Sequence, residues 1–381
     1  MISDKSDNTV KTIAMYLPQY HEIPENSMFW GKGFTDWVSV RNSKPLYQGH
    51  NQPRVPLNKN YYDLSKKETI KWQAQIARQY GVYGFGIYHY WFNSKLNLLQ
   101  KPSELLLSDP GIDINYLFVW DNASWKRSWD NIKFGNDWAP LYEGDVDRRQ
   151  SGILAQLDYG DEEDWRLHFE YLLPFFKDNR YIKIDGKPAF GFFNQDNDSN
   201  TLTKMSEYWN KLAEAEGFPG VAFLGKIKEN SVNTTDYHFY YEPEWDAWTW
   251  HNQFQRVMNK AKRTVNEKTS KVNIYDYDKV WEEILKNAKS DTDMQSFYGS
   301  FVSYDDTPRR GVRGKVIEHG TPDKFRKYYS ELLKISKQKN KEFVFLTAWN
   351  EWGEGAYLEP DETNQYAYLE ALRDAIQGMN Q

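Results

Sequence analysis

Short apolar runs recur along this chain, and each run ends in a cluster of polar and aromatic side chains. Continuous apolar runs rich in Val, Ile, Leu, Phe and Tyr are typical of strands that are buried on both faces, as in a parallel sheet. Eight such runs predict strands over residues 12–17, 84–92, 114–120, 187–193, 221–225, 237–241, 297–302 and 343–346.

Segments with helical periodicity separate most of these runs, and several carry residues that favour helix ends. Ser65 and Glu68 have the spacing of a capping box, Pro102 stands in a first turn, and Gly217 follows a last turn. The predicted helices cover residues 65–80, 102–108, 164–177, 202–216, 277–288, 322–337 and 364–376.

The order of these elements predicts the fold. Eight strands that alternate with helices are typical of an α/β protein built as a (β/α)₈ TIM barrel. We find no internal repeat and no linker, so we expect a single barrel over residues 11–381 behind a polar, disordered tail at residues 1–10. Catalytic groups of such barrels lie at the C-terminal ends of the strands. The long segments 22–64 and 123–163 are expected to wall an open cleft there.

Composition narrows the class of ligand. Aromatic residues make up 17% of the 381 positions, with 16 Trp, 27 Tyr and 21 Phe. Flat amphipathic rings suit the faces of sugars, although they also fill cores. Tryptophans on predicted loops and strand ends favour a stacking cleft, and they are Trp30, Trp37, Trp91, Trp120, Trp125, Trp248, Trp250 and Trp352.

Charge and cysteine content exclude other classes. A net charge of −6 and the lack of a Lys/Arg-rich run argue against a nucleic-acid binder. The absence of cysteine excludes disulfides, thiolate metal sites and a cysteine nucleophile. No apolar run approaches the ~18 residues of a membrane span, and residues 1–11 lack a signal-peptide pattern. The sequence as it stands predicts a cytoplasmic protein, or a periplasmic or extracellular one from which a signal peptide was removed.

The last predicted strand is followed at once by Asn-Glu-Trp-Gly-Glu-Gly, which contains Glu351 and Glu354. In an extended strand this spacing would point the two carboxylates to opposite faces, whereas a helical turn brings their Cβ atoms to roughly 5–6 Å. Gly353 and Gly355 would let the chain turn there. We therefore predict a catalytic pair, against the alternative of two surface glutamates on a solvated turn.

His21 and His89 follow the first two strands, so a metal shared with Asp121 or Glu242 is conceivable from residue types alone. The spacings match no known metal motif, and no HExxH is present. We therefore predict no metal, and we expect these histidines to bind sugar hydroxyls or to brace the carboxylates. No phosphate-binding glycine loop appears either, so we predict no cofactor.

Two further acidic clusters follow strands six and seven. Glu242 and Glu244 rival the main pair, with a rim salt bridge or a support for Arg309 as the structural alternative. Asp305 and Arg309 follow strand seven, where the guanidinium could orient a carboxylate, hold an acidic sugar or close a buried ion pair. The predicted substrate-binding residues are Tyr16, His21, Trp37, Tyr88, His89, Trp120, Asp121, Glu242, Tyr304, Asp305, Arg309, Asn350 and Trp352.

Four motifs carry a resemblance to a known family: AMYLPQYH at 14–21, GFTDW at 33–37, DDTPR at 305–309 and WNEWGEG at 349–355. The chain resembles the WbsX family over nearly its whole length. Members of that family are commonly labelled glycosyltransferases of polysaccharide biosynthesis. The family is similar in turn to the endo-α-mannosidase-like glycoside hydrolases of family ninety-nine, which are (β/α)₈ barrels.

The resemblance implies roles for the two glutamates. Glu351 would be the base that takes the proton of the substrate's 2-hydroxyl, and Glu354 the general acid that protonates the leaving oxygen. The reaction would pass through a 1,2-anhydro sugar with retention. This chain has Gly353 where the hydrolases have histidine, which bears on the identity of the substrate.

The residues and the resemblance together predict a retaining glycoside hydrolase acting on a polysaccharide or oligosaccharide. A glycosyltransferase of O-antigen or capsule biosynthesis is the alternative, although transfer from a nucleotide sugar needs a diphosphate site and we find no basic cluster at the strand ends. A barrel that binds glycans without chemistry is the second alternative, and it would not need two adjacent carboxylates.

Overall fold

Eight parallel strands form the centre of the protein. The structure is a computed structural model of the chain, and it describes residues 9–130, 135–144, 147, 149, 151–228, 234–248, 264, 266, 269 and 271–379. The strands are β1 (Lys11–Tyr16), β2 (Gly84–Asn93), β4 (Asn115–Trp120), β9 (Lys187–Phe192), β10 (Ala222–Lys226), β11 (Tyr237–Phe239), β13 (Ser296–Phe301) and β16 (Phe343–Thr347).

The sheet closes on itself because β1 pairs with both β16 and β2. Ile13 is in register with Phe345 on one side and with Gly84 on the other. All eight predicted strands are present, each within three residues of its predicted ends. The predicted (β/α)₈ TIM barrel is confirmed.

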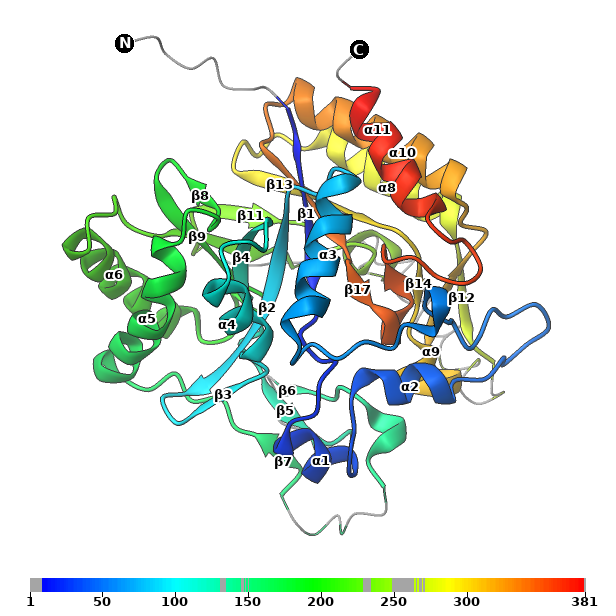
Figure 1. The fold of residues 1–381 in the computed structure, drawn as a ribbon, viewed down its shortest axis with the longest axis horizontal. Coiled ribbons are helices and arrows are strands. Elements are labelled where there is room, and N and C mark those ends of the chain that lie inside the picture. The colour runs from blue at the N-terminus through cyan, green and yellow to red at the C-terminus, as the bar shows by residue number, and fades with distance from the viewer. Residues whose placement is uncertain are drawn as a thin grey trace.

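An outer layer of amphipathic helices covers the barrel (Figure 1). It comprises α3 (Lys67–Gln79), α4 (Lys101–Ser108), α5 (Glu162–Lys177), α6 (Ser199–Ala215), α8 (Tyr277–Ser290), α10 (Pro322–Gln338) and α11 (Ala367–Gln377). The capping box predicted at Ser65 and Glu68 is wrong, because the N-cap of α3 is Lys66, one residue later, and its side chain makes no capping bond. The described helices do not include one that is long and apolar enough to cross a membrane.

Short elements decorate the barrel, most of them where the strands end. Figure 1 shows β1 and β2 running toward the lower part of the view, where α1, α2, β5, β6, β7 and α9 lie. The helical turns are α1 (Pro24–Trp30), α2 (Asp36–Asn42), η1 (Leu57–Lys59), η2 (Pro140–Tyr142), η3 (Glu244–Trp248), α9 (Thr307–Arg310), η4 (Gly311–Arg313) and η5 (Trp352–Glu354). The short strands are β3 (Leu96–Leu98), β5 (Ser124–Lys126), β6 (Gly135–Asn136), β7 (Ile153–Ala155), β8 (Lys183–Ile184), β12 (Asn273–Asp276), β14 (Tyr304–Asp305), β15 (Lys315–Glu318), β17 (Asn350–Glu351) and β18 (Ala356–Tyr357).

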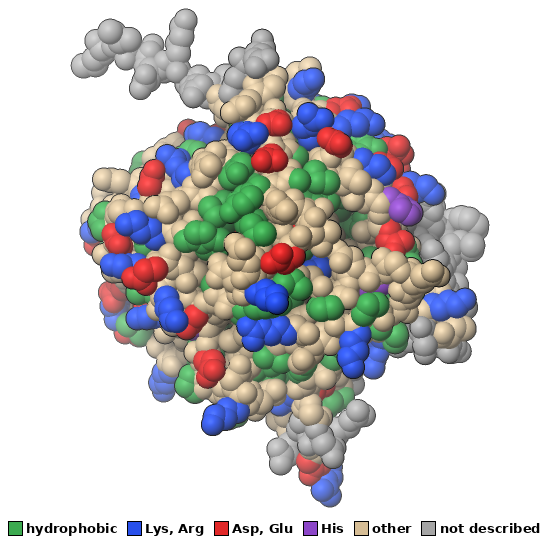
Figure 2. Space-filling view, turned by 45° about the vertical axis from the view of Figure 1, so that its right-hand side comes forward, with side chains coloured by type: hydrophobic (Ala, Val, Ile, Leu, Met, Phe, Trp, Pro, Cys, Tyr) green, Lys and Arg blue, Asp and Glu red, His purple; other side chains and the backbone are tan. Residues whose placement is uncertain are grey.

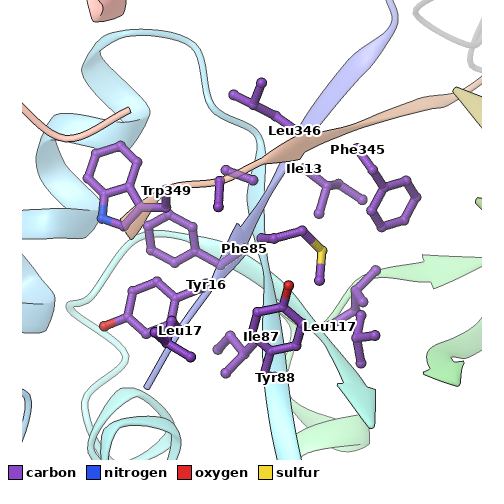
Figure 3. Close-up of a cluster of buried hydrophobic side chains, with 14 of the residues drawn as sticks. Ile13, Tyr16, Leu17, Phe85, Ile87, Tyr88, Leu117, Phe345, Leu346 and Trp349 are labelled. Carbon is purple, nitrogen blue, oxygen red and sulfur yellow. The ribbon is translucent and has the colours of Figure 1, made fainter. Parts of the chain in front are cut away.

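The barrel strands are buried almost throughout, which explains their continuous apolar runs. Phe85 of β2 contacts the rings of Tyr16 and Trp349, with centroids 4.9 and 5.4 Å apart, so that the chain after β16 is packed against β1 and β2 (Figure 3). On the outside, Figure 2 shows basic and acidic side chains interspersed over one face, with neither sign gathered into a large patch.

Candidate active site

The last strand delivers the two predicted glutamates on a helical turn. After β16 the chain forms β17 and then the 3₁₀ turn η5, which ends at Glu354 and is closed by Gly355 at a φ of 55°. The side chain of Asn350 fixes this turn to the end of β1. Its Oδ1 accepts a bond from the Leu17 amide at 2.7 Å, and its Nδ2 donates to the Leu17 carbonyl at 3.0 Å.

A single guanidinium connects both glutamates. Arg309, on α9, donates from Nη1 to Glu354 Oε1 and from Nη2 to Glu351 Oε2, each at 2.9 Å. The same group pairs with Asp36 of α2, through Nη2 at 2.9 Å and Nε at 3.2 Å. Its carbon lies 4.4 Å from the ring centre of Trp138. The Arg309 side chain is only 4% exposed, so three carboxylates share one buried cation.

Burial makes both glutamates weaker acids. It raises the pKa of Glu351 to about 8, against the opposing charge of Arg309 and with a further contribution from Glu354. Burial also raises the pKa of Glu354, against the charge of Arg309. Two carboxylates that interact this closely release their protons in separate steps.

The backbone of the turn is held from behind by buried hydrogen bonds. Tyr20 donates its hydroxyl to the Asn350 carbonyl at 2.5 Å and accepts the Trp352 amide at 3.1 Å. The indole of Trp352 donates to Glu359 at 2.6 Å and stacks on Tyr357. Because backbone and side chain are both anchored, the two carboxylates have little freedom to move apart.

Gly353, between the two glutamates, lies directly against the ion pair behind them. Its amide donates to Asp36 Oδ2 at 3.1 Å. A Cβ at this position would lie 2.5 Å from Arg309 Nε and 2.5 Å from Asp36 Oδ1. The pair of Asp36 and Arg309 therefore fills the space that a side chain at position 353 would need.

The carboxylates face a cleft of about 560 Å³ at the C-terminal ends of the strands, a volume within the range of ligand pockets. Aromatic side chains supply much of its wall, and Tyr88 and Tyr241 join their hydroxyls at 2.7 Å. The second long segment, 123–163, contributes Trp138. No residue of the first long segment, 22–64, lines the cleft, although Asp36 supports it from behind. The aromatic lining comprises Tyr88, Tyr90, Trp138, Phe193, Tyr241 and Tyr304.

The structure brings some of the predicted site residues into this cleft and leaves others outside it. Those that line it are Tyr88, Asp121, Tyr304, Arg309, Glu351 and Glu354. Those that do not line it are Tyr16, His21, Trp37, His89, Trp120, Glu242, Asp305, Asn350 and Trp352. Asn350 and Trp352 hold the turn, and Trp37 packs on Trp352 with ring centroids 5.5 Å apart. Tyr16 donates to Gln73 of α3 at 2.8 Å.

Strand alternation separates the residues predicted on β2. Tyr88 and Tyr90 face the cleft, so His89 and Trp91 face the helix layer. His89 Nε2 lies 2.9 Å from His168 Nε2 of α5, and burial lowers the pKa of His89 to about 3. Trp120 also packs on His168, with ring centroids 5.0 Å apart. Among the described residues, no group of three or more His, Asp or Glu is placed to hold a metal ion.

Two predicted acids point away from the cleft, and their neighbours line it instead. Asp305 accepts bonds from Gln52 at 2.7 Å and from Thr307 at 2.6 Å, and it borders a second cavity of about 470 Å³. Glu242 is buried toward α8 and accepts the Asp246 amide at 3.0 Å. Asp306 and Glu244 are the acids that line the cleft at these two places.

Six of the tryptophans expected in a stacking cleft do not line this one, and they are Trp30, Trp37, Trp91, Trp120, Trp125 and Trp352. The side chain of Trp248 and the whole of Trp250 lie outside the described part of the chain. Trp30 and Trp125 pack together with ring centroids 5.7 Å apart and form a small core beneath the loops. Because side chains alternate between the two faces of a strand, the choice of Tyr88 could have been extended to Tyr90 on the same face of β2. Trp138 lies in an irregular segment, where no sequence pattern marks it.

Removing the shared guanidinium should cost more stability than removing a surface ion pair. We expect Arg309→Met to lower the free energy of unfolding by about 3–5 kcal/mol, because the buried carboxylates of Asp36 and Glu351 and the partly exposed one of Glu354 lose their common partner. Arg166→Met, which breaks the exposed pairs with Glu163 and Glu170 on α5, should cost about 1 kcal/mol or less. Urea denaturation of both variants measures the difference, and equal losses would contradict a desolvated network.

The raised pKa of Glu351 predicts a pH dependence of stability. A carboxyl whose pKa rises on folding, here from 4.5 to about 8, stabilises the protein fully below its unfolded pKa, and that contribution is lost as pH rises through the folded value. Between about pH 5 and pH 8.5, wild type should therefore lose stability more steeply than Glu351→Gln. Glu283→Gln, at an exposed position on α8, should follow wild type. Parallel curves for Glu351→Gln and wild type in urea titrations would contradict the raised pKa.

Comparison with solved structures identifies the same architecture in glycoside hydrolases. A protein described as "Glycoside hydrolase-like protein" superimposes with a TM-score of 0.56 at 12% identity, covering 97% of this chain and 94% of that one. The GH99 endo-alpha-mannosidase of Bacteroides thetaiotaomicron gives a TM-score of 0.50 at 15% identity, covering 98% of this chain and 97% of that one. At these identities the likeness concerns the fold.

Comparison with curated sequences and family profiles identifies the family. The "Uncharacterized protein WxcX" of Xanthomonas campestris pv. campestris strain B100 is 26% identical over 369 residues, which cover 96% of this chain and 49% of that protein. The chain thus spans about half the length of the curated relatives that it matches. The profile described as "Glycosyltransferase WbsX" matches residues 12–372, and the chain therefore belongs to the WbsX family.

Proposed function

We propose that this protein, a carbohydrate-active enzyme by its fold and family, is a retaining glycoside hydrolase that cleaves a polysaccharide or oligosaccharide. The observation that carries the proposal is the pair Glu351 and Glu354 on one buried guanidinium. Both carboxylates face a cleft at the catalytic end of a barrel, and burial raises the pKa of both. One acid and one base at a glycosidic bond are the groups that glycoside hydrolysis uses.

The proposed roles follow the resemblance to the family ninety-nine hydrolases. Glu351 takes the proton of the 2-hydroxyl, whose oxygen attacks the anomeric carbon, and the bond to the leaving oxygen breaks. Glu354 gives its proton to that oxygen, so the first step yields a 1,2-anhydro sugar. In the second step Glu354 takes a proton from water, which opens the anhydro ring, and Glu351 returns its proton to O2. Two inversions at the anomeric carbon give retention.

The exposures of the Glu351 and Glu354 side chains support this assignment of base and acid. The Glu354 side chain is 24% exposed and borders the open cleft, where a leaving group departs, whereas the Glu351 side chain is 6% exposed. In the free protein the deeper burial of Glu351 favours the proton there. The proposed roles therefore require the bound substrate to reverse that preference, since a 2-hydroxyl that donates to Glu351 stabilises its ionised form.

Glycosyl transfer is the second candidate function, and one observation favours it beside the family's description. Lys226, Lys228 and Lys315 line the same cleft as the glutamates. The sequence had indicated no basic cluster at the strand ends, and that expectation is wrong because these lysines come together only in the fold. Release of a nucleoside diphosphate from a nucleotide sugar, assayed beside hydrolysis of a polysaccharide panel, separates the two activities.

The rates of glutamine variants test the two roles. Each of Glu351→Gln and Glu354→Gln should lower kcat on a natural glycan by about 10²–10⁴-fold. An aryl glycoside, whose leaving group needs no proton, should restore the first step of Glu354→Gln, seen as a burst of aryl release, although the step with water still lacks its base. Glu351→Gln should give no such burst. Glu283→Gln should match wild type on both substrates. If the aryl glycoside restored Glu351→Gln instead, Glu351 would be the general acid and Glu354 the base.

A 2-fluoro glycoside tests the anhydro intermediate separately. Without a 2-hydroxyl it should be inert toward the intact enzyme. A Glu351 peptide labelled by this compound would show a glycosyl-enzyme ester and contradict the anhydro route. If both glutamine variants kept wild-type activity on a confirmed substrate, the pair would be structural and the proposed function would fail.

A further inference from the structure

The cavity of about 470 Å³ that Asp305 borders lies beside the catalytic cleft, and we call it the second cavity. The two hollows share a wall, the segment after β13, where Asp306 lines the cleft and its neighbour Asp305 lines the second cavity. The facing walls come from residues 47–54 of the first long segment and from residues 357–368. Its volume is within the range of ligand pockets, and no step of the proposed hydrolysis uses a residue that lines it.

The buried lining of the second cavity consists of polar groups that already have hydrogen-bond partners. Asp361 accepts from the Tyr357 hydroxyl at 2.7 Å and from Asn364 Nδ2 at 3.2 Å. Glu359 accepts from Gln73 Nε2 at 2.7 Å. Because these side chains fix one another, the second cavity is formed before any ligand enters it.

One aromatic ring of the second cavity is held as a platform. Tyr47 stacks on His50, with ring centroids 4.4 Å apart and 12° between the planes. His50 is fixed at both nitrogens, because Nδ1 accepts the Leu46 amide at 3.1 Å and Nε2 lies 2.8 Å from Asp305 Oδ2. An amide N–H only donates, so Nδ1 is the acceptor and Nε2 donates its proton to Asp305. Asp305, which the sequence predicted to bind substrate, thus orients this ring stack.

The stack leaves one face of the Tyr47 ring for a ligand. His50 covers the opposite face, and no second ring in the described part of the chain contacts Tyr47. Tyr47 is half-buried and lines the second cavity. The C–H groups of a sugar ring pack well on such a flat, amphipathic face.

The exposed rim of the second cavity offers hydrogen-bond donors and acceptors together. An amide side chain donates through its nitrogen and accepts through its oxygen, and a threonine hydroxyl does both. The hydroxyl groups of a neutral sugar match both kinds of partner. The side chains of this polar rim are those of Gln48, Asn51, Thr363 and Gln365.

Charge argues against an anionic ligand in the second cavity. Four acidic residues line it, and they are Asp305, Glu318, Glu359 and Asp361. Arg54 and His319 oppose them, but Arg54 Nη1 already donates to the Gly355 carbonyl at 2.9 Å, and His319 pairs with Asp276 at 3.0 Å. An anion would therefore meet an excess of carboxylates, whereas sugar hydroxyls can donate to them.

We infer that the second cavity binds a neutral saccharide, one unit of which stacks on Tyr47 and forms hydrogen bonds with the polar rim. The class of ligand rests on the carbohydrate-active fold and family, and not on the roles proposed for Glu351 and Glu354. The saccharide is either a distant unit of the chain that occupies the cleft or a separate molecule. Both present the same chemistry to Tyr47, and the experiment separates them.

A single introduced cysteine reports on the second cavity alone, because the chain has no cysteine of its own. We would label Thr363→Cys, on the exposed rim, with an environment-sensitive fluorophore in a Glu354→Gln background that leaves the probes intact. The probes are neutral oligosaccharides of glucose, mannose, galactose and xylose. At least one series should change the fluorescence saturably. The same label at Lys71→Cys, an exposed position on α3, should not respond.

Unlabelled variants in the same background test the platform by calorimetry. Tyr47→Ala should weaken binding of the responding saccharide by about three- to tenfold, because the stacked ring is lost. Tyr47→Phe keeps the ring and should retain most of the affinity. Tyr208→Ala, which removes a half-buried ring on α6, should bind as the parent does. Added salt should leave the affinity unchanged, since the ligand carries no charge.

The outcomes decide both the ligand and its source. If no neutral saccharide changes the Thr363 label, if only UDP or spermidine does so, or if Tyr47→Ala binds as the parent does, the saccharide site is overturned. Short saccharides whose affinity depends on Tyr47 assign a site that binds on its own. Dependence on Tyr47 only for chains long enough to reach the cleft as well assigns a distant unit of the same chain. Since binding is measured without hydrolysis, this proposal and the proposed function can fail separately.

Discussion

The whole site depends on the bidentate and shared contacts of the Arg309 guanidinium. This one cation joins an aspartate from the first long loop, two glutamates from the last loop, and its own segment after β13. Its fork can serve several carboxylates at fixed angles, which a lysine ammonium cannot do. Because the network is desolvated, each member is costly without the others. The closure of the barrel, which brings β16 beside β1, is what allows these distant segments to meet.

Much of the fold could be predicted from the sequence, because a strand buried on both faces has an unmistakable apolar run. The helical turn at Glu351 and Glu354 was also predictable, since the glycines and the spacing of the acids belong to one short segment. The directions in which the side chains point were harder to predict. Along β2, period two assigns Tyr88 and His89 to opposite faces, yet both are polar aromatics at a strand end, and residue type alone selected both.

After the strands end, the sequence has no periodic pattern from which the direction of a side chain could be predicted. Asp305 and Asp306 are adjacent, and so nearly are Glu242 and Glu244, but the local turn decides which acid reaches the cleft. Lys226, Lys228 and Lys315, which line the cleft, were not recognised for another reason. They come from two segments, and the sequence does not show that β10 and β15 bring these segments together. Trp138 is likewise placed by residues that are distant in the sequence, namely Arg309, Trp30 and Phe34.

The crowding around Gly353 has a consequence for how such sites can differ. A carboxylate at position 36 and any side chain at position 353 compete for one volume, so the two positions cannot vary independently. The histidine that the family ninety-nine hydrolases carry at this point of the motif could enter here only if both Asp36 and Arg309 moved. The form of the motif with glycine and the form with histidine therefore need different arrangements of the side chains around position 353. A single substitution at this position does not convert one arrangement into the other, because the new side chain would clash. Combined changes at 36 and 353 should be strongly non-additive.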